Sequence, residues 1–190
     1  MDKSNKKFAL LIASEIPRKI NIYGDLGDLF YDFLYDENEI WDKYKCYEDE
    51  FPEDLLEYDG FIITGSEFYA SDNKPWIERL KHLIRELHKL KKNLLGECFG
   101  HHIIAVALGG KVGKKNADYV PGMFTLNITK DGYERFPQLE GYSELVYSKC
   151  HTEIVTELPP EAKLIATGSD TLVEIFSIGD HILGLQGHPE

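Results

Sequence analysis

The amino-acid sequence predicts an α/β protein with a mostly parallel central sheet, to which β-ribbons are added. Two observations predict the sheet: short, continuous apolar segments closed by turn-forming residues, and helical patterns between those segments. A third observation predicts the ribbons, because the second half of the chain consists of short strand-like runs broken by glycine, proline, serine and aspartate. A strand followed by a helix and another strand is typical of parallel α/β folds.

The first half of the chain supplies three expected strands and two expected helices. The strands are residues 8–13 (FALLIA), 61–65 (FIITG) and 93–98 (NLLGEC). Between the last two, the segment KPWIERLKHLIRELHKLKK repeats apolar residues at three- and four-residue steps, which predicts an amphipathic helix with Pro75 in its first turn. The run HHIIAVALGG, residues 101–110, predicts a second helix directly after the third strand.

The second half is expected to add strands without a new domain. It contains no internal repeat, no low-complexity linker and no clear boundary, so we expect a single domain over residues 1–190. The expected strands are residues 122–129, 143–148, 163–168, 171–179 and 181–187.

Composition and charge exclude several classes of protein. The formal net charge of -12 argues against nucleic-acid binding, which needs a basic face. No apolar run reaches the roughly 18 residues that span a membrane. The three cysteines, Cys46, Cys98 and Cys150, are too few and too scattered for a disulfide framework, so we expect a cytoplasmic protein. Neighbouring helical side chains such as His101 and His102 diverge, and no zinc-type spacing is present, so neither a metal nor another cofactor is expected.

The stretch NLLGECFGHH contains a cysteine between two glycines, at the junction of an expected strand and an expected helix. Such a junction can be a tight turn that projects a reactive Cys98, with Gly96 and Gly100 allowing the bend. The following helix favours a thiolate, and the N–H of Phe99 could donate to an oxyanion. Alternatively, Cys98 is a small buried apolar residue, which is the commonest role of a free cysteine. The pattern alone leaves both interpretations open.

The end of the chain, GLQGHPE, supplies the groups that a thiol nucleophile needs. His188 and Glu190 are separated only by Pro189, so their side chains can point the same way. An imidazole could take the thiol proton while a carboxylate fixes its tautomer and orientation. His-Pro-Glu alone is a weak signal, and the combination with the cysteine turn makes it strong.

These motifs resemble those of class I glutamine amidotransferases, which carry Gly-x-Cys-x-Gly-His-Gln and His-Pro-Glu. GECFGHH is followed here by ALGGKVG, and GLQGHPE closes the chain. The resemblance is closer still to the plant γ-glutamyl peptidase branch and covers nearly the entire chain. It extends through KKFALLIAS, YDGFIITGS, DNKPWIERL, KCHTEIVTELPPEAKLIATGS and VEIFSIGDHILGLQGHPE.

The resemblance implies a three-layer α/β/α flavodoxin-like fold and a Cys-His-Glu triad. It implies that Cys98 is the nucleophile, His188 the general base and acid, and Glu190 the orienting carboxylate. It also implies that the oxyanion donors are Phe99 and Gly65, with Ser66 beside them at the substrate. The implied reaction attacks a γ-glutamyl carbonyl, forms a thioester and hydrolyses it.

Three features of the sequence depart from the family pattern. His102 stands where the family has a glutamine that contacts the glutamyl group, and a histidine keeps only part of that hydrogen bonding. Glu97 precedes the cysteine where the family has an apolar residue, so it either lies near the thiol and raises the thiol pKa, or faces away and finds a donor or becomes protonated. Relatives continue past His-Pro-Glu, so we expect that the family's C-terminal helical extension is missing after Glu190.

Two further residues lie in the segment KCHTEIVTELPP. The resemblance implies that His151 lines the substrate pocket, although a structural hydrogen bond within a turn is equally compatible with the sequence. Cys150 is expected to be buried and inert.

The sequence therefore predicts a cysteine hydrolase that acts on a small γ-glutamyl substrate, such as glutathione or its conjugates. Two other functions stay open. The chain could be a glutaminase subunit that delivers ammonia to a separate synthase, or a relative without catalytic activity.

Overall fold

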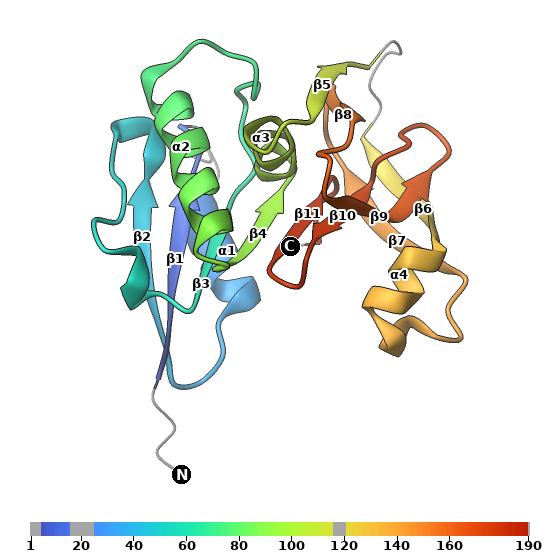
Figure 1. Ribbon diagram of the computed structural model, residues 1–190, viewed down its shortest axis with the longest axis horizontal. Helices are drawn as coiled ribbons and strands as arrows, with labels where there is room; N and C mark the ends of the chain where they lie inside the picture. The colour runs from blue at the N-terminus through green and yellow to red at the C-terminus, as the bar shows by residue number, and fades with distance from the viewer. Residues whose placement is uncertain (1–4, 16–24, 116–120, 190) are drawn as a thin grey trace.

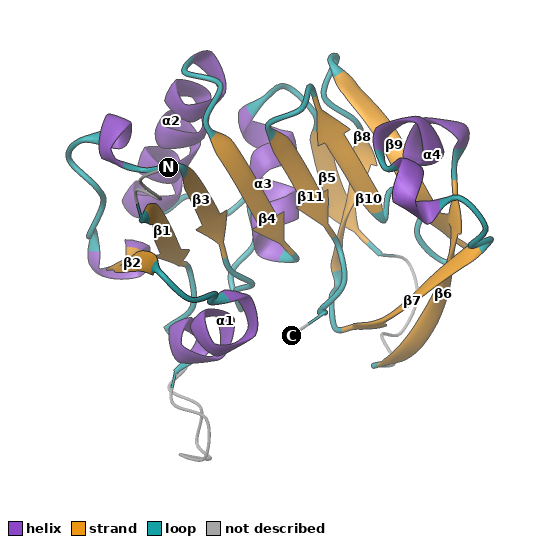
Figure 2. Ribbon diagram, turned by 90° about the horizontal axis from the view of Figure 1, so that it is seen from below, coloured by secondary structure: helices purple, strands orange, loops and turns teal. Residues whose placement is uncertain are grey.

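A nine-stranded sheet forms the centre of the molecule, with helices on both faces (Figures 1 and 2). The computed structural model describes residues 5–15, 25–115 and 121–189. The sheet has the strand order β2-β1-β3-β4-β11-β10-β9-β6-β7, and a separate ribbon pairs β5 with β8.

Five neighbouring strands make up the parallel half of the sheet. They are β2 (Glu39–Lys45), β1 (Lys6–Ile12), β3 (Gly60–Ile63), β4 (Asn93–Glu97) and β11 (Ile182–Leu185). The expected strands at residues 8–13, 61–65 and 93–98 are therefore confirmed. The inner parallel strands are buried on both faces, so their sequences are continuous apolar runs, as in the four buried residues of β3.

Four strands extend this sheet in antiparallel fashion. They are β10 (Ile175–Ile178), β9 (Ala162–Gly168), β6 (Gly122–Ile128) and β7 (Glu144–Lys149). The ribbon consists of β5 (Lys111–Lys114) and β8 (Glu153–Glu157). The predicted fold class, with a parallel sheet, helices on both faces and added ribbons, is confirmed.

Two helices, α2 (Pro75–Lys89) and α3 (Phe99–Ala107), cover one face of the sheet. Pro75 is the first residue of α2, as predicted, because proline is tolerated where no helical hydrogen bond is lost. The opposite face carries α1 (Leu26–Leu34) and α4 (Lys130–Arg135). Alternate side chains of β1 serve the two cores: Leu11 faces α2 and α3, whereas Leu10 packs with Phe30 of α1.

Several short elements were not predicted from the sequence. They are α1, α4, β2, β5, β8 and three 3₁₀ turns at Cys46–Glu48, Leu55–Glu57 and Pro137–Leu139. Most of these elements are short, and β2, which is as long as β1, is only partly buried at the edge of the sheet. Within the described ranges, no helix has both the length and the apolar character needed to cross a bilayer.

Candidate active site

A cavity of about 600 Å³ opens at the carboxyl ends of the parallel strands. This is the edge where α/β sheets commonly bind ligands. All the site residues that the sequence predicted within the described ranges line this cavity: Gly65, Ser66, Cys98, Phe99, His102, His151 and His188. Glu190 lies outside the described residues.

Cys98 occupies a tight turn between β4 and α3. Its backbone angles are φ 49° and ψ −99°, a conformation that non-glycine residues adopt rarely and at a cost in strain. The turn stays tied to its neighbours, because the N–H of Cys98 donates to the carbonyl of Leu185 at 2.7 Å. The carbonyl of Cys98 accepts from the N–H of His102 at 3.1 Å and so starts the helix.

The two glycines beside Cys98 are needed for close backbone approach. A Cβ on Gly96 would lie 2.5 Å from the carbonyl oxygen of Gly100 and would also overlap Ile104. A Cβ on Gly100 would lie 2.5 Å from the carbonyl oxygen of Ile63. Any side chain here would push α3 away from the sheet, so the glycines hold Cys98 at the mouth of the cavity.

His188 follows β11 and reaches the same cavity. Its N–H donates to the carbonyl of Ser148 at 2.8 Å, and the hydroxyl of Ser148 donates to the carbonyl of His188 at 3.2 Å. The preceding Gly187 lies against Tyr147, whose ring would overlap any Cβ at that position. The His188 segment is therefore fixed by the end of β7, far away in the sequence.

A buried polar network supports this anchoring. The hydroxyl of Tyr147 donates to Glu174 Oε2 at 2.9 Å, and Lys149 Nζ lies 2.5 Å from Glu174 Oε1. Lys149 also pairs with Asp170 at 2.5 Å. The N–H of Gln186 donates to the carbonyl of Glu174 at 2.8 Å. Glu174 is fully buried, and its charge is matched by Lys149, which is 1% exposed.

Glu97 turns toward His188. Its Oε1 lies 2.5 Å from His188 Nδ1, and the residue is only 1% exposed. The contact gives Glu97 a partner in His188, as one of the two possibilities required, while the charge of Glu97 also raises the pKa of the Cys98 thiol, as the other required. Sequence reasoning identified the unusual residue, but it gave no signal that the histidine would be its partner.

Burial raises the pKa of the Cys98 thiol. A hydrogen bond with His188 and the charge of that ring lower the pKa of Cys98, whereas the charge of Glu97 raises it further. The net direction is upward, contrary to the expectation that the following helix favours a thiolate. The thiol therefore stays protonated at rest and needs a base within the site to remove its proton during attack.

The predicted oxyanion donors lie on either side of Cys98. Phe99 is the first residue of α3, and the N–H of a residue in the first helical turn has no partner within its own helix. The carbonyl of Gly65 accepts from the hydroxyl of Thr64 at 2.9 Å, and that hydroxyl accepts from the N–H of Ala13 at 3.0 Å. These bonds fix the loop after β3 next to Cys98.

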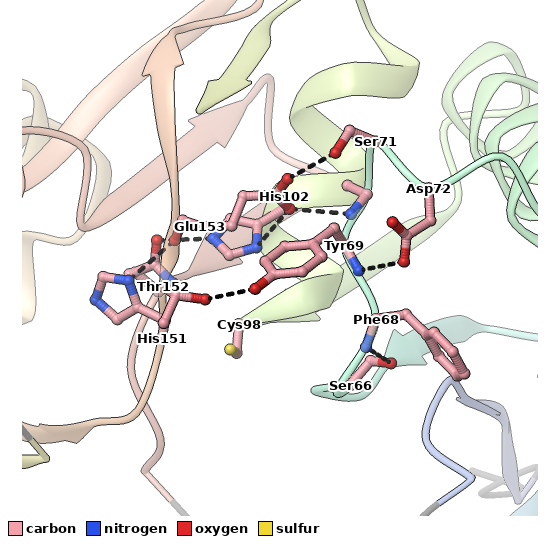
Figure 3. A network of polar contacts seen from close by, with 12 residues as sticks. Ser66, Phe68, Tyr69, Ser71, Asp72, Cys98, His102, His151, Thr152 and Glu153 are labelled. Carbon is pink, nitrogen blue, oxygen red and sulfur yellow. Dashed lines mark hydrogen bonds and ion pairs between the residues drawn. The ribbon is translucent and has the colours of Figure 1, made fainter. Parts of the chain in front are cut away.

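His102 and Glu153 form a polar cluster on the wall of the cavity (Figure 3). His102 Nε2 lies 2.9 Å from Gln186 Oε1, and its Nδ1 lies 3.4 Å from Glu153 Oε2. Glu153 also accepts from the N–H of Ala70 at 2.9 Å and from the hydroxyl of Ser71 at 3.3 Å. Burial lowers the pKa of His102 to about 4, so the ring is neutral at pH 7.

His151 and Ser66 line the cavity but also make structural hydrogen bonds. His151 Nδ1 donates to the carbonyl of Glu153 at 3.0 Å, and burial lowers the pKa of His151 to about 4. The hydroxyl of Ser66 donates to the carbonyl of Ala13 at 2.6 Å and accepts from the N–H of Phe68 at 3.0 Å.

The expectation that Cys150 is buried is wrong. Cys150 is exposed and lines the cavity, because it follows β7 in the loop that faces the nucleophile turn. Its carbonyl oxygen lies 3.9 Å from Cys98 Sγ. No group of three or more histidine, cysteine or carboxylate side chains in the described part of the chain could hold a metal ion.

Comparison with known families decides the affiliation of the chain. Residues 37–190 match the family model "Glutamine amidotransferase class-I". The chain belongs to this family. Its membership makes it an enzyme of the glutamine amidotransferase type, as the sequence motifs predicted.

Individual relatives agree with this assignment. The chain is 40% identical to gamma-glutamyl peptidase 3 of Arabidopsis thaliana, over 99% of this chain and 78% of the relative. It is also 40% identical to gamma-glutamyl peptidase 4 of the same plant, over 97% of this chain and 76% of the relative. One component of a glutamine-hydrolyzing GMP synthase from Saccharolobus solfataricus is 29% identical, over 73% of this chain and 70% of the relative.

Solved structures of this glutamine amidotransferase family share the fold. A glutamine amidotransferase of Thermotoga maritima superposes with a TM-score of 0.78 at 21% identity, over 97% of this chain and 76% of the other. A glutamine amidotransferase of Methylobacillus flagellatus gives a TM-score of 0.81 at 22% identity, over 97% of this chain and 70% of the other.

Proposed function

We propose that this glutamine amidotransferase hydrolyses γ-glutamyl amide bonds through a thioester on Cys98. The observation that carries the proposal is the convergence of Cys98, in its strained turn, and His188 on one cavity. The substrate class that we propose is γ-glutamyl peptides, such as glutathione or its conjugates. The names of the two plant relatives support this choice. The free thiols Cys46, Cys98 and Cys150 support a cytoplasmic location.

The reaction begins with proton transfer from Cys98 to His188. The sulfur attacks the γ-carbonyl carbon, the carbonyl π bond opens, and the resulting oxyanion accepts hydrogen bonds from Phe99 N–H and the Gly65 loop. When the carbon–nitrogen bond breaks, the protonated ring returns its proton to the leaving amine. A water molecule, deprotonated by His188, then cleaves the thioester to release glutamate and restore the thiol.

The rest of the cavity is suited to holding the glutamyl group. We propose that Ser66, His102 and His151 contact it, each at a position already fixed by hydrogen bonds within the protein. The neutral His102 ring offers hydrogen bonding without placing a second cation beside the proton transfer. The cavity volume falls within the range of about 300–1,000 Å³ that is typical of small-molecule sites.

A second candidate function is that of a glutaminase subunit which hands ammonia to a separate synthase. The similarity to one component of a glutamine-hydrolyzing GMP synthase favours this candidate. It predicts that glutamine is the better substrate and that turnover rises when the synthase partner is added.

Trapping at Cys98 distinguishes these candidates. The protein is incubated with a diazo or chloroketone analogue of glutamine, and the adduct is located by intact-protein and peptide mass spectrometry. We expect one adduct on Cys98, absent in His188→Ala, with glutathione protecting the thiol better than glutamine does. Better protection by glutamine would instead indicate the glutaminase subunit.

The other two thiols serve as internal controls. Cys46 is buried, and burial raises its pKa strongly, whereas Cys150 is exposed at the same cavity. Equal labelling of Cys98 and Cys150, or no adduct at all, would contradict the catalytic proposal.

A further inference from the structure

Glu97 is a buried carboxylate whose position within the site sequence motifs do not explain. It is the last residue of β4, is 1% exposed, and has Oε1 2.5 Å from His188 Nδ1. A buried carboxylate costs several kcal/mol unless it is paired or hydrogen-bonded. The close contact with the imidazole offsets that cost. It also places the negative charge of Glu97 next to Nδ1 of the ring.

The turn at Cys98 allows two consecutive residues to reach one site. In a regular strand, Glu97 and Cys98 would point to opposite faces of the sheet. The positive φ of Cys98 breaks this alternation. As a result, the side chains of Glu97, Cys98 and His188 meet next to Gly65. A Cβ added to Gly65 would lie 3.5 Å from His188 Cε1, 3.6 Å from Glu97 Oε1 and 3.7 Å from Cys98 Cβ.

We propose that Glu97 is the carboxylate that positions His188 and keeps its proton on Nδ1. This inference assigns to the residue before the nucleophile a role that the His-Pro-Glu motif assigns to Glu190. It rests on the proposed function, in which His188 takes the proton of Cys98, and it deepens that function by naming a further positioning residue.

The chemistry requires a carboxylate on this side of the ring. With Nδ1–H donated to Glu97, the lone pair of the neutral ring lies on Nε2, which is then the ring nitrogen that can take up a proton. After the transfer, the carboxylate stabilises the imidazolium. The same charge raises the pKa of Cys98. Burial, with a smaller contribution from the charge of Glu97, keeps the thiol protonated at rest, and Glu97 favours the ring as the proton's destination during attack.

Three substitutions test the inference with glutathione as substrate. Glu97→Gln keeps the size of the side chain and removes its charge, so we expect kcat to fall about 10²- to 10⁴-fold, with KM changed less than about threefold. Glu97→Asp, which keeps the carboxylate, should recover part of this loss. Glu190→Gln, the matched change at the motif carboxylate, should lower kcat less than Glu97→Gln does.

A spectroscopic measurement separates positioning from a merely structural effect. In protein labelled with ¹⁵N-histidine, the neutral His188 ring should carry its proton on Nδ1 in the wild type and in Glu97→Asp. The preference should weaken in Glu97→Gln. Circular dichroism and thermal melting check that each variant is folded.

Other outcomes would overturn the inference or the proposed function separately. A large loss of kcat in Glu190→Gln, together with near-normal turnover and an unchanged His188 tautomer in Glu97→Gln, would overturn the role of Glu97. If the wild type does not cleave γ-glutamyl substrates, the proposed function fails, and the tautomer measurement still decides whether Glu97 positions His188.

Discussion

Cys98 follows β4 and His188 follows β11, two neighbouring parallel strands, but different halves of the sheet hold the two residues in place. The Cys98 turn belongs to the parallel half and is fixed by close backbone approach, with Gly96 and Gly100 pressed between α3 and the strands. The His188 segment is held by the antiparallel half, through Ser148 and the ring of Tyr147.

The difference shows that two kinds of interaction set the geometry of the site. The position of Cys98 depends on two glycines, whose lack of a side chain allows close backbone approach. The position of His188 depends on buried charged residues at the end of β7 and just before β10. The ion pair of Lys149 with Glu174 is the centre of that second support. Substitutions in the two halves should therefore change stability and catalysis in different proportions.

The largest expected loss of stability follows from Lys149→Met. This change leaves Glu174 fully buried without its closest cation, and breaking a buried pair in this way costs about 3–5 kcal/mol. Urea unfolding measures the loss. Because Ser148 accepts from His188 next to this pair, kcat should also fall.

The double variant Lys149→Met/Glu174→Gln is the control for this prediction. It removes the isolated charge together with its partner, so its free energy of unfolding should exceed that of the single variant. A loss below about 1 kcal/mol in Lys149→Met would contradict the importance of the network.

Gly100→Ala should affect catalysis more than stability. The added Cβ would lie 2.5 Å from the carbonyl oxygen of Ile63, so α3 must shift and Cys98 must move with it. Overpacking of this kind costs about 1–3 kcal/mol, partly offset by the preference of helices for alanine. A displacement of about 1 Å at the nucleophile can cost about 100-fold in rate, which the trapping rate at Cys98 measures.

Gly122→Ala is the matched control in the antiparallel half. Its added Cβ would lie at an ordinary distance of 3.7 Å from Phe124, so trapping should proceed at the wild-type rate. Equal rates for the two alanine variants would show that close approach at Gly100 does not position Cys98.

The parallel half was easier to predict from the sequence than the elements added to it. Buried strands such as β1 and β3 are continuous apolar runs, and α2 has a clear apolar face. In contrast, β2 (EIWDKYK) lies at the edge and is buried only in part, so its sequence carries no clear period. Short helices such as α4 are stabilised by contacts with the sheet that no local pattern reports.

The sequence predicted which residues line the site, but it did not predict the directions of their side chains or the contacts between them. Glycines around Cys98 predicted the turn, because few other structures need them. The orientation of Glu97 depends on the unusual backbone of Cys98, which strand alternation does not anticipate. The contact of Gly187 with Tyr147 joins residues 40 positions apart, and such pairing has no local signal.

His102 contacts both sides of the site, so substituting it tests how the two sides are linked. This test has the smallest expected effect. His102 belongs to the first turn of α3, close to Cys98. Its Nε2 lies 2.9 Å from Oε1 of Gln186, which is two residues before His188. Burial lowers the pKa of His102 to about 4, whereas a histidine in the unfolded chain titrates near pH 6.5. The unfolded chain therefore binds a proton that the folded chain excludes.

This difference makes part of the stability depend on pH. The contribution of His102 is complete above about pH 6.5 and is lost as the pH falls toward 4, with about 1–2 kcal/mol lost by pH 5. His102→Gln should remove that part, so the free energy of unfolding should fall less between pH 7 and pH 5 than in the wild type. The pKa of His151 is similarly lowered, so His151 makes the same contribution to the pH dependence of stability in both proteins. Burial raises the pKa of Glu153, which changes stability with pH in the opposite direction. Urea unfolding at each pH measures this dependence. If the free energy of unfolding changes with pH equally in the two proteins, a neutral His102 does not contribute to the stability of the fold.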